Sequence, residues 1–348
     1  MKVLVTGGAG YIGSHTVLSL LNADYEVVVY DNFCNSSLES IRRVEKLSGS
    51  SVTFIEGDIQ DRASLERVFS EHAIGAVIHF AALKAVGESA RIPLQYYQNN
   101  VHGSLCLLEV MQAHGVHDFI FSSSATVYGE KNKSPYMETM PMGEPSSPYG
   151  VSKLMVEMVM ADQAKANGDF RGVSLRYFNP IGAHESGLIG EDPNGIPNNL
   201  LPFVAQVSVG KRSHLSIFGD DYPTADGTCE RDYLHVMDLA EGHVAALDWM
   251  QKAREFRGVE VFNLGTGNSV SVLQIVNAFE QACEKPIPYQ VASRRAGDLA
   301  AFWADASKAK QVLGWVAKRP LAQMMADTWR WQSGNPNGYK AVENTEDA

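Results

Sequence analysis

The chain has 348 residues, of which 45% are hydrophobic and 20% charged, so it can bury a large core and form about two domains. Its 29 Lys and Arg residues against 40 Asp and Glu give a net charge of −11, which disfavours non-specific binding to nucleic acids or anionic membranes. The four cysteines stand far apart without CxxC spacing, which excludes the usual zinc site and a disulfide scaffold. No apolar run reaches the roughly 18 residues of a membrane span, and the first run is too short for a signal peptide. We therefore expect a cytoplasmic protein without nucleic-acid or membrane partners.

The first half of the chain alternates short apolar runs with segments of helical period. Because the runs are rich in Val, Ile and Phe and lack alternation, they are typical of parallel strands buried on both faces. The pattern predicts an α/β fold with a doubly wound parallel (Rossmann) sheet. The expected strands are 2–6, 26–31, 52–58, 76–81, 119–122 and 173–177, and the expected helices are 14–22, 37–46, 62–71, 94–114 and 149–167.

The pattern loosens after residue 180, where residues 181–230 are rich in Gly, Pro and Asn. A helical pattern returns at 236–247 and a strand pattern at 259–264. We predict a second, smaller α/β domain for the substrate. The expected division is 1–180 with 236–264 returning to it, then 181–235 with 265–335, and a polar tail over 336–348 whose last eight residues we expect to be disordered.

A glycine-rich turn follows the first predicted strand directly. Gly7, Gly10 and Gly13 allow a tight turn, and the backbone N–H groups of the next helix can then approach a pyrophosphate. Asp31 ends the second strand, 18 residues after Gly13, where a carboxylate can bind both ribose hydroxyls and repel a 2′-phosphate. This pattern predicts NAD rather than NADP. Asp58 ends the third strand in the same way, and it can either reach an adenine edge or cap the following helix.

A tyrosine, a lysine and a serine form a second constellation. Tyr149 and Lys153 are four residues apart and share one face of a predicted helix, which Pro148 suits as a first-turn residue. A nearby cation stabilises a phenolate, so we expect the pKa of Tyr149 to lie below the usual value of about 10. Ser124 ends a strand at the carboxyl edge of the sheet, where doubly wound folds bind ligands. Each pattern alone is common by chance, but together with the glycine turn they predict one redox site.

Several segments closely resemble known enzymes over about residues 1–335. The chain is similar to the extended short-chain dehydrogenase/reductase superfamily and, within it, to the UDP-galactose 4-epimerase family. The resemblance implies reversible conversion of UDP-galactose to UDP-glucose through a 4-keto sugar, with tightly bound NAD. It also implies a homodimer built from 94–114 and 149–167. The segments are TGGAGYIG, FSSSATVYG, SPYGVSKLMVE, LRYFNPIGAH, GIPNNLLPF, TCERDYLHVMDLAEGHVAAL and NLGTGNSVSVL.

The resemblance also implies roles for single residues. Tyr149 would remove the proton of the sugar 4-OH, Ser124 would hydrogen-bond the same hydroxyl, and Lys153 would hold the nicotinamide ribose and keep Tyr149 anionic. The residues implied for NAD are Gly7, Gly10, Tyr11, Ile12, Gly13, Asp31, Asn32, Asn35, Ser36, Asp58, Ile59, Phe80, Ala81, Lys84, Asn99, Ser122, Tyr149, Lys153 and Phe178. Those implied for the UDP-sugar are Ser124, Tyr149, Asn179, Asn199, Leu200, Phe218, Arg231, Arg295, Asp298 and Phe302.

Two features of the substrate set carry chemistry of their own. Arg231 and the pair Arg294-Arg295 offer guanidinium forks that suit a diphosphate, and Asp298 can accept a ribose hydroxyl. In the resembling family, the residue at the position of Phe302 bounds the space beside the C2 substituent of the sugar. A bulky Phe302 implies a preference for UDP-glucose and UDP-galactose over N-acetylated sugars.

Three other readings stay open at this stage. An epimerase for an N-acetylated UDP-sugar would share these motifs but not the bulky residue at the position of Phe302. A nucleotide-sugar 4,6-dehydratase needs an acid and a base after the serine strand, where this chain has only Ser124-Ala125-Thr126. A non-catalytic NAD-binding regulator can lose the Tyr or the Lys, whereas both are present here. His79, His184 and His235 lack metal-ligand spacing, so we expect structural histidines and no metal site.

Overall fold

The computed structural model describes residues 1–195, 197, 199–295 and 297–340, so the tail that we expect to be disordered, 341–348, lies outside the described residues. Its elements are β1 (Lys2–Thr6), α1 (Tyr11–Asn22), β2 (Glu26–Asp31), α2 (Leu38–Ser48), β3 (Thr53–Glu56), α3 (Arg62–Glu71), β4 (Ile74–His79), α4 (Val86–Ser89), α5 (Pro93–Tyr96), η1 (Tyr97–His102), α6 (Gly103–Ala113), β5 (Asp118–Ser124), η2 (Ala125–Tyr128), α7 (Pro148–Ala166), β6 (Arg171–Tyr177), β7 (Asn179–Ile181), α8 (Leu200–Ser208), β8 (Leu215–Phe218), β9 (Glu230–Arg231), β10 (Tyr233–His235), α9 (Val236–Lys252), β11 (Gly258–Leu264), β12 (Val270–Ser271), α10 (Val272–Cys283), β13 (Tyr289–Ala292), β14 (Ala301–Phe302), η3 (Ala309–Leu313) and α11 (Leu321–Gly334).

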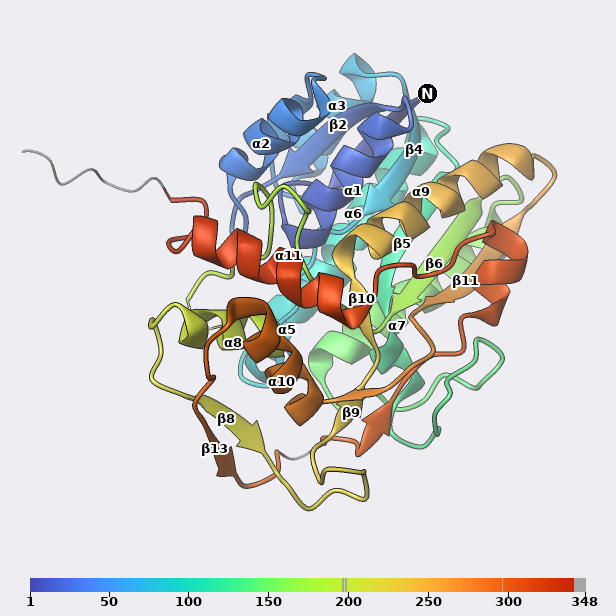
Figure 1. Cartoon of the computed structure of the whole chain (residues 1–348). Coiled ribbons are helices and arrows are strands. Elements are labelled where there is room, and N and C mark those ends of the chain that lie inside the picture. The colour runs from blue at the N-terminus through green and yellow to red at the C-terminus, as the bar shows by residue number, and fades with distance from the viewer. Residues whose placement is uncertain (196, 198, 296, 341–348) are drawn as a thin grey trace, which may run out of the picture.

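Within the described residues, one seven-stranded sheet runs in the order β11-β6-β5-β4-β1-β2-β3, and every neighbouring pair is parallel. Figure 1 shows this sheet with helices on both faces. The order reverses at β1, since β2 lies on one side of it and β4 on the other. The loops after β1 and β4 therefore diverge and open a crevice at the carboxyl edge. The predicted doubly wound parallel sheet is confirmed.

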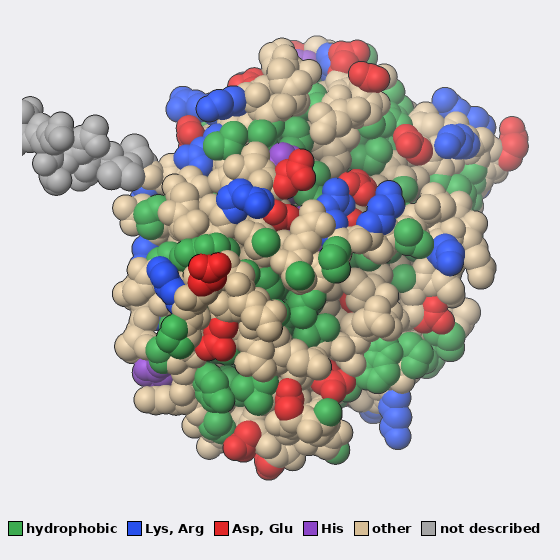
Figure 2. Space-filling model, viewed as in Figure 1, with side chains coloured by type: hydrophobic (Ala, Val, Ile, Leu, Met, Phe, Trp, Pro, Cys, Tyr) green, Lys and Arg blue, Asp and Glu red, His purple; other side chains and the backbone are tan. Residues whose placement is uncertain are grey.

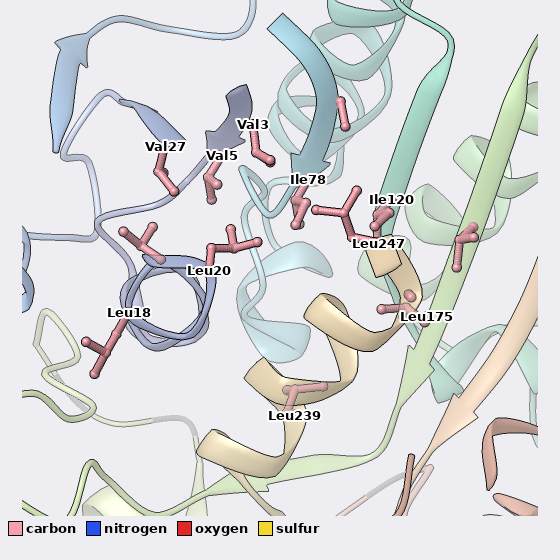
Figure 3. Packing of buried hydrophobic residues seen from close by; sticks show 14 of the residues in the cluster. Val3, Val5, Leu18, Leu20, Val27, Ile78, Ile120, Leu175, Leu239 and Leu247 are labelled. Atoms are coloured by element: carbon pink, nitrogen blue, oxygen red, sulfur yellow. The ribbon is translucent and has the colours of Figure 1, made fainter. Parts of the chain in front are cut away.

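Both faces of the sheet are buried, which explains why its strands are continuously apolar. In β1, Val3 and Val5 point into one core and Leu4 into the other, and all three are fully buried. Figure 3 shows the first of these cores, where Leu20 of α1 and Leu247 of α9 face the strand residues. The second core lies under α3, α6 and α7.

A smaller region follows the large sheet along the chain. Helices α8, α10 and α11 share a core of their own, and α8 and α10 lie below the large sheet in Figure 1. Three small sheets, β10-β7, β12-β9-β14 and β13-β8, complete this region. Between its segments, α9 packs on α1, and β11 extends the large sheet beside β6. The boundaries that we drew between two domains stay a prediction.

The predicted strand 52–58 is shorter in the structure, since β3 ends at Glu56 and Asp58 lies two residues beyond it, and one predicted helix is not continuous. Instead of one continuous helix over 94–114, the chain forms α5, the π-helical turns of η1, and α6. Asn100 in η1 explains this local widening, because its side chain is buried and bonds the backbone N–H and C=O of Leu83 at 2.8 and 2.9 Å. It also donates to the Ser152 hydroxyl on α7 at 3.0 Å. The bonds of Asn100 thus fix the π-helical segment η1 against the loop after β4 and against α7. The neighbouring Asn99 lines the crevice.

The surface charge and the apolarity of the helices bear on which partners the protein can bind. On the face in Figure 2, acidic and basic side chains are interspersed over the whole view. None of the helices in the described ranges combines the length and apolarity that a membrane crossing needs.

Candidate active site

The glycine turn lies at the N-terminus of α1, and two of its glycines are required by close approach. Gly7 has a φ of +69°, and a Cβ there would lie 2.6 Å from the Ala81 nitrogen. A Cβ on Gly13 would lie 2.2 Å from the Gly7 carbonyl oxygen. The N-cap residue Gly10 provides no side-chain cap, and the first turn of α1 has no acidic residue. The first N–H groups of α1 therefore remain available for an anionic ligand such as a pyrophosphate.

Asp31 lies beside this turn at the end of β2. Its carboxylate accepts hydrogen bonds from the N–H groups of Ala9 and Phe33 at 3.0 and 2.9 Å, and from the Ser36 hydroxyl at 2.7 Å. These bonds hold a nearly buried anion at the wall of the crevice. A carboxylate in this place suits the hydroxyls of an adenosine ribose and repels a 2′-phosphate.

The crevice is a cavity of about 380 Å³ at the carboxyl edge of the sheet. It brings together most residues predicted to contact NAD, from the glycine turn, the β2 and β4 loops, η1 and α7. They are Gly7, Gly10, Tyr11, Ile12, Gly13, Asp31, Asn32, Asn35, Ser36, Ile59, Phe80, Ala81, Lys84, Asn99, Ser122, Tyr149 and Lys153. The glycine cradle, the open helix N-terminus and Asp31 all fit a dinucleotide.

Two residues of the predicted NAD set lie outside the cavity lining. The Asp58 carboxylate instead accepts hydrogen bonds from the Asn32 amide and the Gln60 backbone N–H at 2.8 and 2.9 Å. The alternative reading of Asp58 as a helix cap is wrong, because Asp61 caps α3. Phe178 packs on Phe302, with ring centroids 4.9 Å apart. It therefore contacts the substrate end of the site.

Sequence reasoning missed several parts of the lining, among them Tyr177, residues 190–194 and Tyr339. Tyr177 ends β6, and its hydroxyl is hydrogen-bonded to that of Ser122. Its position at the carboxyl end of a strand could have identified it. Residues 190–194 and Tyr339 also line the cavity, although they carry no motif. Tyr339 falls in the stretch that we grouped with the polar tail, yet it packs against the body of the protein.

The tyrosine and the lysine lie on α7, whose start explains their placement. Ser147 caps α7 by accepting from the Gly150 N–H, and Pro148 occupies its first turn. Lys153 is 3% exposed, and its ammonium donates to the Ser122 carbonyl at 2.7 Å. Its Nζ lies 6.0 Å from the centroid of the Tyr149 ring. The helix thus brings phenol and amine to the end of β5, beside the cavity.

Ser124 is the last residue of β5 and is nearly buried. Its hydroxyl oxygen accepts from the N–H and the hydroxyl of Thr126 at 3.2 and 3.0 Å. Burial raises the pKa of the Tyr149 phenol, and the neighbouring Ser124 hydroxyl lowers this pKa less strongly. The three residues therefore meet at one place, as predicted from the sequence.

The predicted direction of the Tyr149 pKa is wrong for the protein alone, because burial raises it above 10. Burial also lowers the pKa of Lys153 to about 7, although the neighbouring Glu157 carboxylate acts in the opposite direction. A buried amine that is only partly charged at neutral pH stabilises a phenolate weakly. When bound, the positive nicotinamide ring of an oxidised cofactor would favour ionisation of Tyr149 further.

Glu157 is a buried charged residue that belongs to no motif identified in the sequence. Its carboxylate pairs with Arg176 of β6 and accepts from the hydroxyls of Ser123 and Ser174. These bonds tie α7 to β5 and β6 one turn beyond Lys153. The charge network therefore fixes the position of α7 against the sheet, and with it the tyrosine and lysine.

The substrate end collects four of the predicted side chains into one cluster. Asp298 pairs with Arg231 at 3.4 Å and with Arg295 at 3.0 Å. The Arg295 guanidinium lies 4.7 Å from the centroid of the Phe218 ring. Arg294 is separate, since it pairs with Asp221 at 2.6 Å. Two neighbouring guanidinium groups beside an exposed aromatic ring suit a nucleoside diphosphate.

Phe302 lies beside this cluster because β14 pairs with β9, which places it opposite Arg231. The Tyr136 and Phe178 rings pack on it, with centroids 4.6 and 4.9 Å away. Asn179 is fixed nearby, since its N–H and its side-chain amide both donate to the Asp232 carbonyl. Phe302 is therefore held in place within a rigid aromatic group.

Asn199 and Leu200 lie at the start of α8, where Asn199 is the N-cap. The Asn199 side-chain amide donates to Glu191 at 2.9 Å, and Lys84 donates to the same oxygen at 3.1 Å. Glu191 thereby joins one residue predicted for the substrate to one predicted for the cofactor.

The three histidines noted in the sequence all have protein partners. His79 bonds the hydroxyls of Thr6 and Ser104, and burial lowers its pKa to about 3. His235 accepts from the Met237 N–H, and His184 bonds Ser186. In the part of the chain that the structure describes, no group of three His, Cys, Asp or Glu side chains could hold a metal ion.

Comparisons with known proteins agree with this geometry. Residues 4–328 match the family described as GDP-mannose 4,6 dehydratase. The UDP-glucose 4-epimerase of Erwinia amylovora is 61% identical over 338 residues, covering 97% of this chain and 99% of the relative. The UDP-glucose 4-epimerase of Bacillus subtilis (strain 168) is 57% identical over 343 residues, covering 99% of this chain and 100% of the relative.

A solved structure extends the likeness to three dimensions. The UDP-glucose 4-epimerase of Bifidobacterium longum, in complex with NAD⁺ and UDP, has a TM-score of 0.94 and 52% identity, covering 97% of this chain and 100% of that one. The chain also lacks a carboxylate in Ser124-Ala125-Thr126, where the dehydratase reading required one. On fold, site and identity together, the chain belongs to the UDP-glucose 4-epimerase family of the extended short-chain dehydrogenase/reductases.

Proposed function

We propose that the protein interconverts UDP-galactose and UDP-glucose by reversible oxidation at C4 of the sugar, with NAD as bound cofactor. The observation that carries this proposal is the meeting of Tyr149, Lys153 and Ser124 at the carboxyl edge of the sheet, beside a cavity whose glycine turn fits a pyrophosphate. The close relatives named UDP-glucose 4-epimerase support the choice of reaction.

The residues divide the chemistry among them. Tyr149 accepts the proton of the sugar 4-OH when hydride leaves C4, and it returns the proton when the 4-keto sugar is reduced on its other face. Ser124 hydrogen-bonds the same oxygen and orients it. Lys153 supplies positive charge behind the phenol and a donor for the nicotinamide ribose. Bound NAD provides the reversible hydride acceptor that the step needs.

The charge and size of a few side chains determine the specificity at the NAD end and at the UDP-sugar end of the site. Asp31 favours NAD over NADP at the adenosine ribose. Arg231 and Arg295 bind the diphosphate of the UDP group, and Asp298 accepts a hydroxyl of its ribose. Phe302 fills the space beside C2 of the sugar, which favours UDP-glucose and UDP-galactose over N-acetylated sugars.

The protein acts as a homodimer in the cytoplasm. The outer surface of α5, α6 and α7 exposes large apolar side chains, among them Leu94 (82% exposed), Met158 (53%) and Met155 (40%). Such a patch favours association of two copies through these helices. Sedimentation of the purified protein tests this, since a monomeric mass would contradict it.

The reaction is tested with purified protein and UDP-galactose, without added cofactor, and UDP-glucose is sought by chromatography. We expect product, because the bound NAD is regenerated in each cycle. Product that appears only after NAD is added would keep the reaction and overturn tight binding. No product with or without NAD would overturn the proposed reaction.

A further inference from the structure

Residues 190–194, which we call the strap, form the wall of the cavity that does not belong to the large sheet. Glu191 is the central contact of the strap, since its carboxylate accepts from Lys84 and Asn199 at 3.1 and 2.9 Å. At its far end, the Asn194 amide donates to the Cys34 carbonyl in the loop after β2, at 3.4 Å. The strap therefore crosses from the substrate end to the β2 side of the cavity.

Tyr339, in the segment after α11, holds the strap by hydrogen bonds. Its hydroxyl lies 3.2 Å from the nitrogen and 3.3 Å from the carbonyl oxygen of Gly190, accepting from the first and donating to the second. Its backbone N–H donates to the Asp192 carboxylate at 2.8 Å. Tyr339 follows α11, whose C-terminal end lies on the side of α2 in Figure 1. Three hydrogen bonds thus fasten the strap to the end of the chain.

Arg43 of α2 completes this attachment. Its guanidinium lies 5.9 Å from the Trp331 ring and 5.2 Å from the Tyr339 ring, and the two rings are 4.9 Å apart. The same group donates to the Leu188 carbonyl just before the strap, at 3.0 Å. Trp331 donates from its ring nitrogen to the Glu191 carbonyl at 3.2 Å. Trp331 of α11 therefore bonds the strap directly, and Arg43 of α2 stacks on the Trp331 and Tyr339 rings and bonds the chain just before the strap.

The packing is too close for side chains at two glycines. A Cβ on Gly190 would lie 2.4 Å from the Trp331 ring. A Cβ on Gly338 would lie 2.0 Å from the Asp192 carboxylate, at a φ of +68°. The chain therefore uses glycine on both sides of the contact, so that the strap and the C-terminal segment can touch.

We propose that Gly338 and Tyr339 are a latch that holds the strap over the cofactor cavity and slows the release of NAD. The inference rests on the proposed binding of NAD in this cavity. For the strap to move away from a bound dinucleotide, the Tyr339 bonds to Gly190 and Asp192 must break. Tyr339 lines the cavity itself, and its bonds to Gly190 and Asp192 also make it a positioning residue for the strap.

The test measures NAD release directly. Purified holoprotein is diluted with an excess of an NAD-hydrolysing enzyme, which destroys released NAD, and protein-bound NAD is quantified by chromatography over time. We expect Tyr339→Ala to release NAD at least roughly tenfold faster than wild type, because ring packing and the hydroxyl bonds are both lost. Tyr339→Phe keeps the ring and the backbone bond, so its release should be intermediate. Tyr289→Ala, at an exposed tyrosine in β13, is the matched control and should release NAD at the wild-type rate.

A second readout separates the latch from a merely structural role. Dilution should make Tyr339→Ala lose epimerase activity with time, and added NAD should restore it, which a misfolded protein would not show. Release from Tyr339→Ala at the wild-type rate, in protein with a normal melting transition, would overturn the latch. If Tyr339→Ala does not fold, wild-type release from Tyr339→Phe and from Gly338→Ala would overturn it instead. The release assay involves no UDP-sugar, so wild type that retains NAD without epimerising would contradict the proposed reaction and leave the latch standing.

Discussion

The cofactor cavity takes most of its residues from the carboxyl ends of neighbouring strands in one sheet, whereas the substrate end is assembled from short strands and loops far apart in the sequence. In the cavity, β1 pairs with β2 along its whole length, up to Thr6 opposite Tyr30, and this register brings the next residue, Asp31, beside the glycine turn. At the substrate end, Arg231 meets Phe302 only through the short pairing of β9 with β14. Many backbone hydrogen bonds of the large sheet thus fix the side chains of the cavity, whereas few such bonds of the small sheet fix those at the substrate end. We expect substitutions in the cavity to affect the chemical step, and those at the substrate end to affect binding.

The largest effect is expected at the phenol. Tyr149→Phe removes the proton acceptor but keeps the ring, so kcat for UDP-galactose should fall by roughly 10³-fold or more, with the fold intact. Product formation under saturating substrate measures this, and a thermal melt serves as control. Activity within tenfold of wild type would show that another group takes the proton.

The amine four residues away should matter next, with a distinct pH signature. Lys153→Met should lower kcat by roughly 10²-fold or more, because the charge behind the phenol is lost. Since the pKa of the buried amine is about 7 instead of 10.5, the unfolded chain binds more protons than the folded protein between these values. Wild-type stability therefore rises with pH across this window through this group.

Denaturant unfolding of both proteins at several pH values checks the sign of this effect. The stability of Lys153→Met relative to wild type should be highest at pH 7 and below, and it should decline as pH approaches 10.5. A difference that does not change with pH would contradict the low pKa of Lys153.

Substitutions at the substrate end should separate the two regions. Arg231 is mostly buried, with 16% side-chain exposure, and donates to the Leu299 carbonyl at 2.8 Å, whereas Arg295 is 55% exposed. Arg231→Ala should raise KM for UDP-galactose by roughly 30-fold, and Arg295→Ala by a smaller factor, with kcat changed less than KM in both. Arg212→Ala, at a cation on the Phe203 ring, is the matched control. A loss confined to kcat would contradict the division between chemistry and binding.

The smallest effect is expected at Phe302, the side chain proposed to lie beside C2 of the sugar. Phe302→Cys opens space beside C2 of the sugar, so turnover of UDP-N-acetylglucosamine should rise by several-fold to about tenfold, while UDP-glucose turnover changes little. Because Tyr136 and Phe178 pack on this ring, some stability is lost with it. Comparable turnover of UDP-glucose and UDP-N-acetylglucosamine by wild type would contradict this role of Phe302. So would a variant that turns over UDP-N-acetylglucosamine no faster than wild type.

The sequence was most informative where one local signal fixes one local structure. The predicted helix 62–71 coincides with α3, and the strand ends at Asp31 and Tyr177 match the structure. The glycine turn and the spacing of Tyr149 and Lys153 likewise needed only neighbouring residues. These features depend on period, capping and strand ends, all of which can be read within about ten residues.

Other features depend on contacts between distant parts of the chain. Asp58 and Phe178 lie just beyond the ends of β3 and β6, as cavity residues do beyond other strands, but tertiary packing gives them other partners. The pKa of Tyr149 depends on burial, which spacing does not reveal. Tyr339 stands beside a polar tail, and only its long-range contact with Gly190 places it at the cavity.

The pairing of Phe302 with Arg231 has a consequence for how the sugar can move. One short ladder carries both the cation proposed for the diphosphate and a wall of the proposed sugar space. Affinity can then come almost entirely from the nucleotide, while the hexose itself is held weakly enough to turn and present either face. A protein organised in this way should discriminate poorly between two epimers of the same nucleotide sugar. It should not accept the corresponding free hexoses, because they lack the nucleotide that would keep them bound while the sugar rotates.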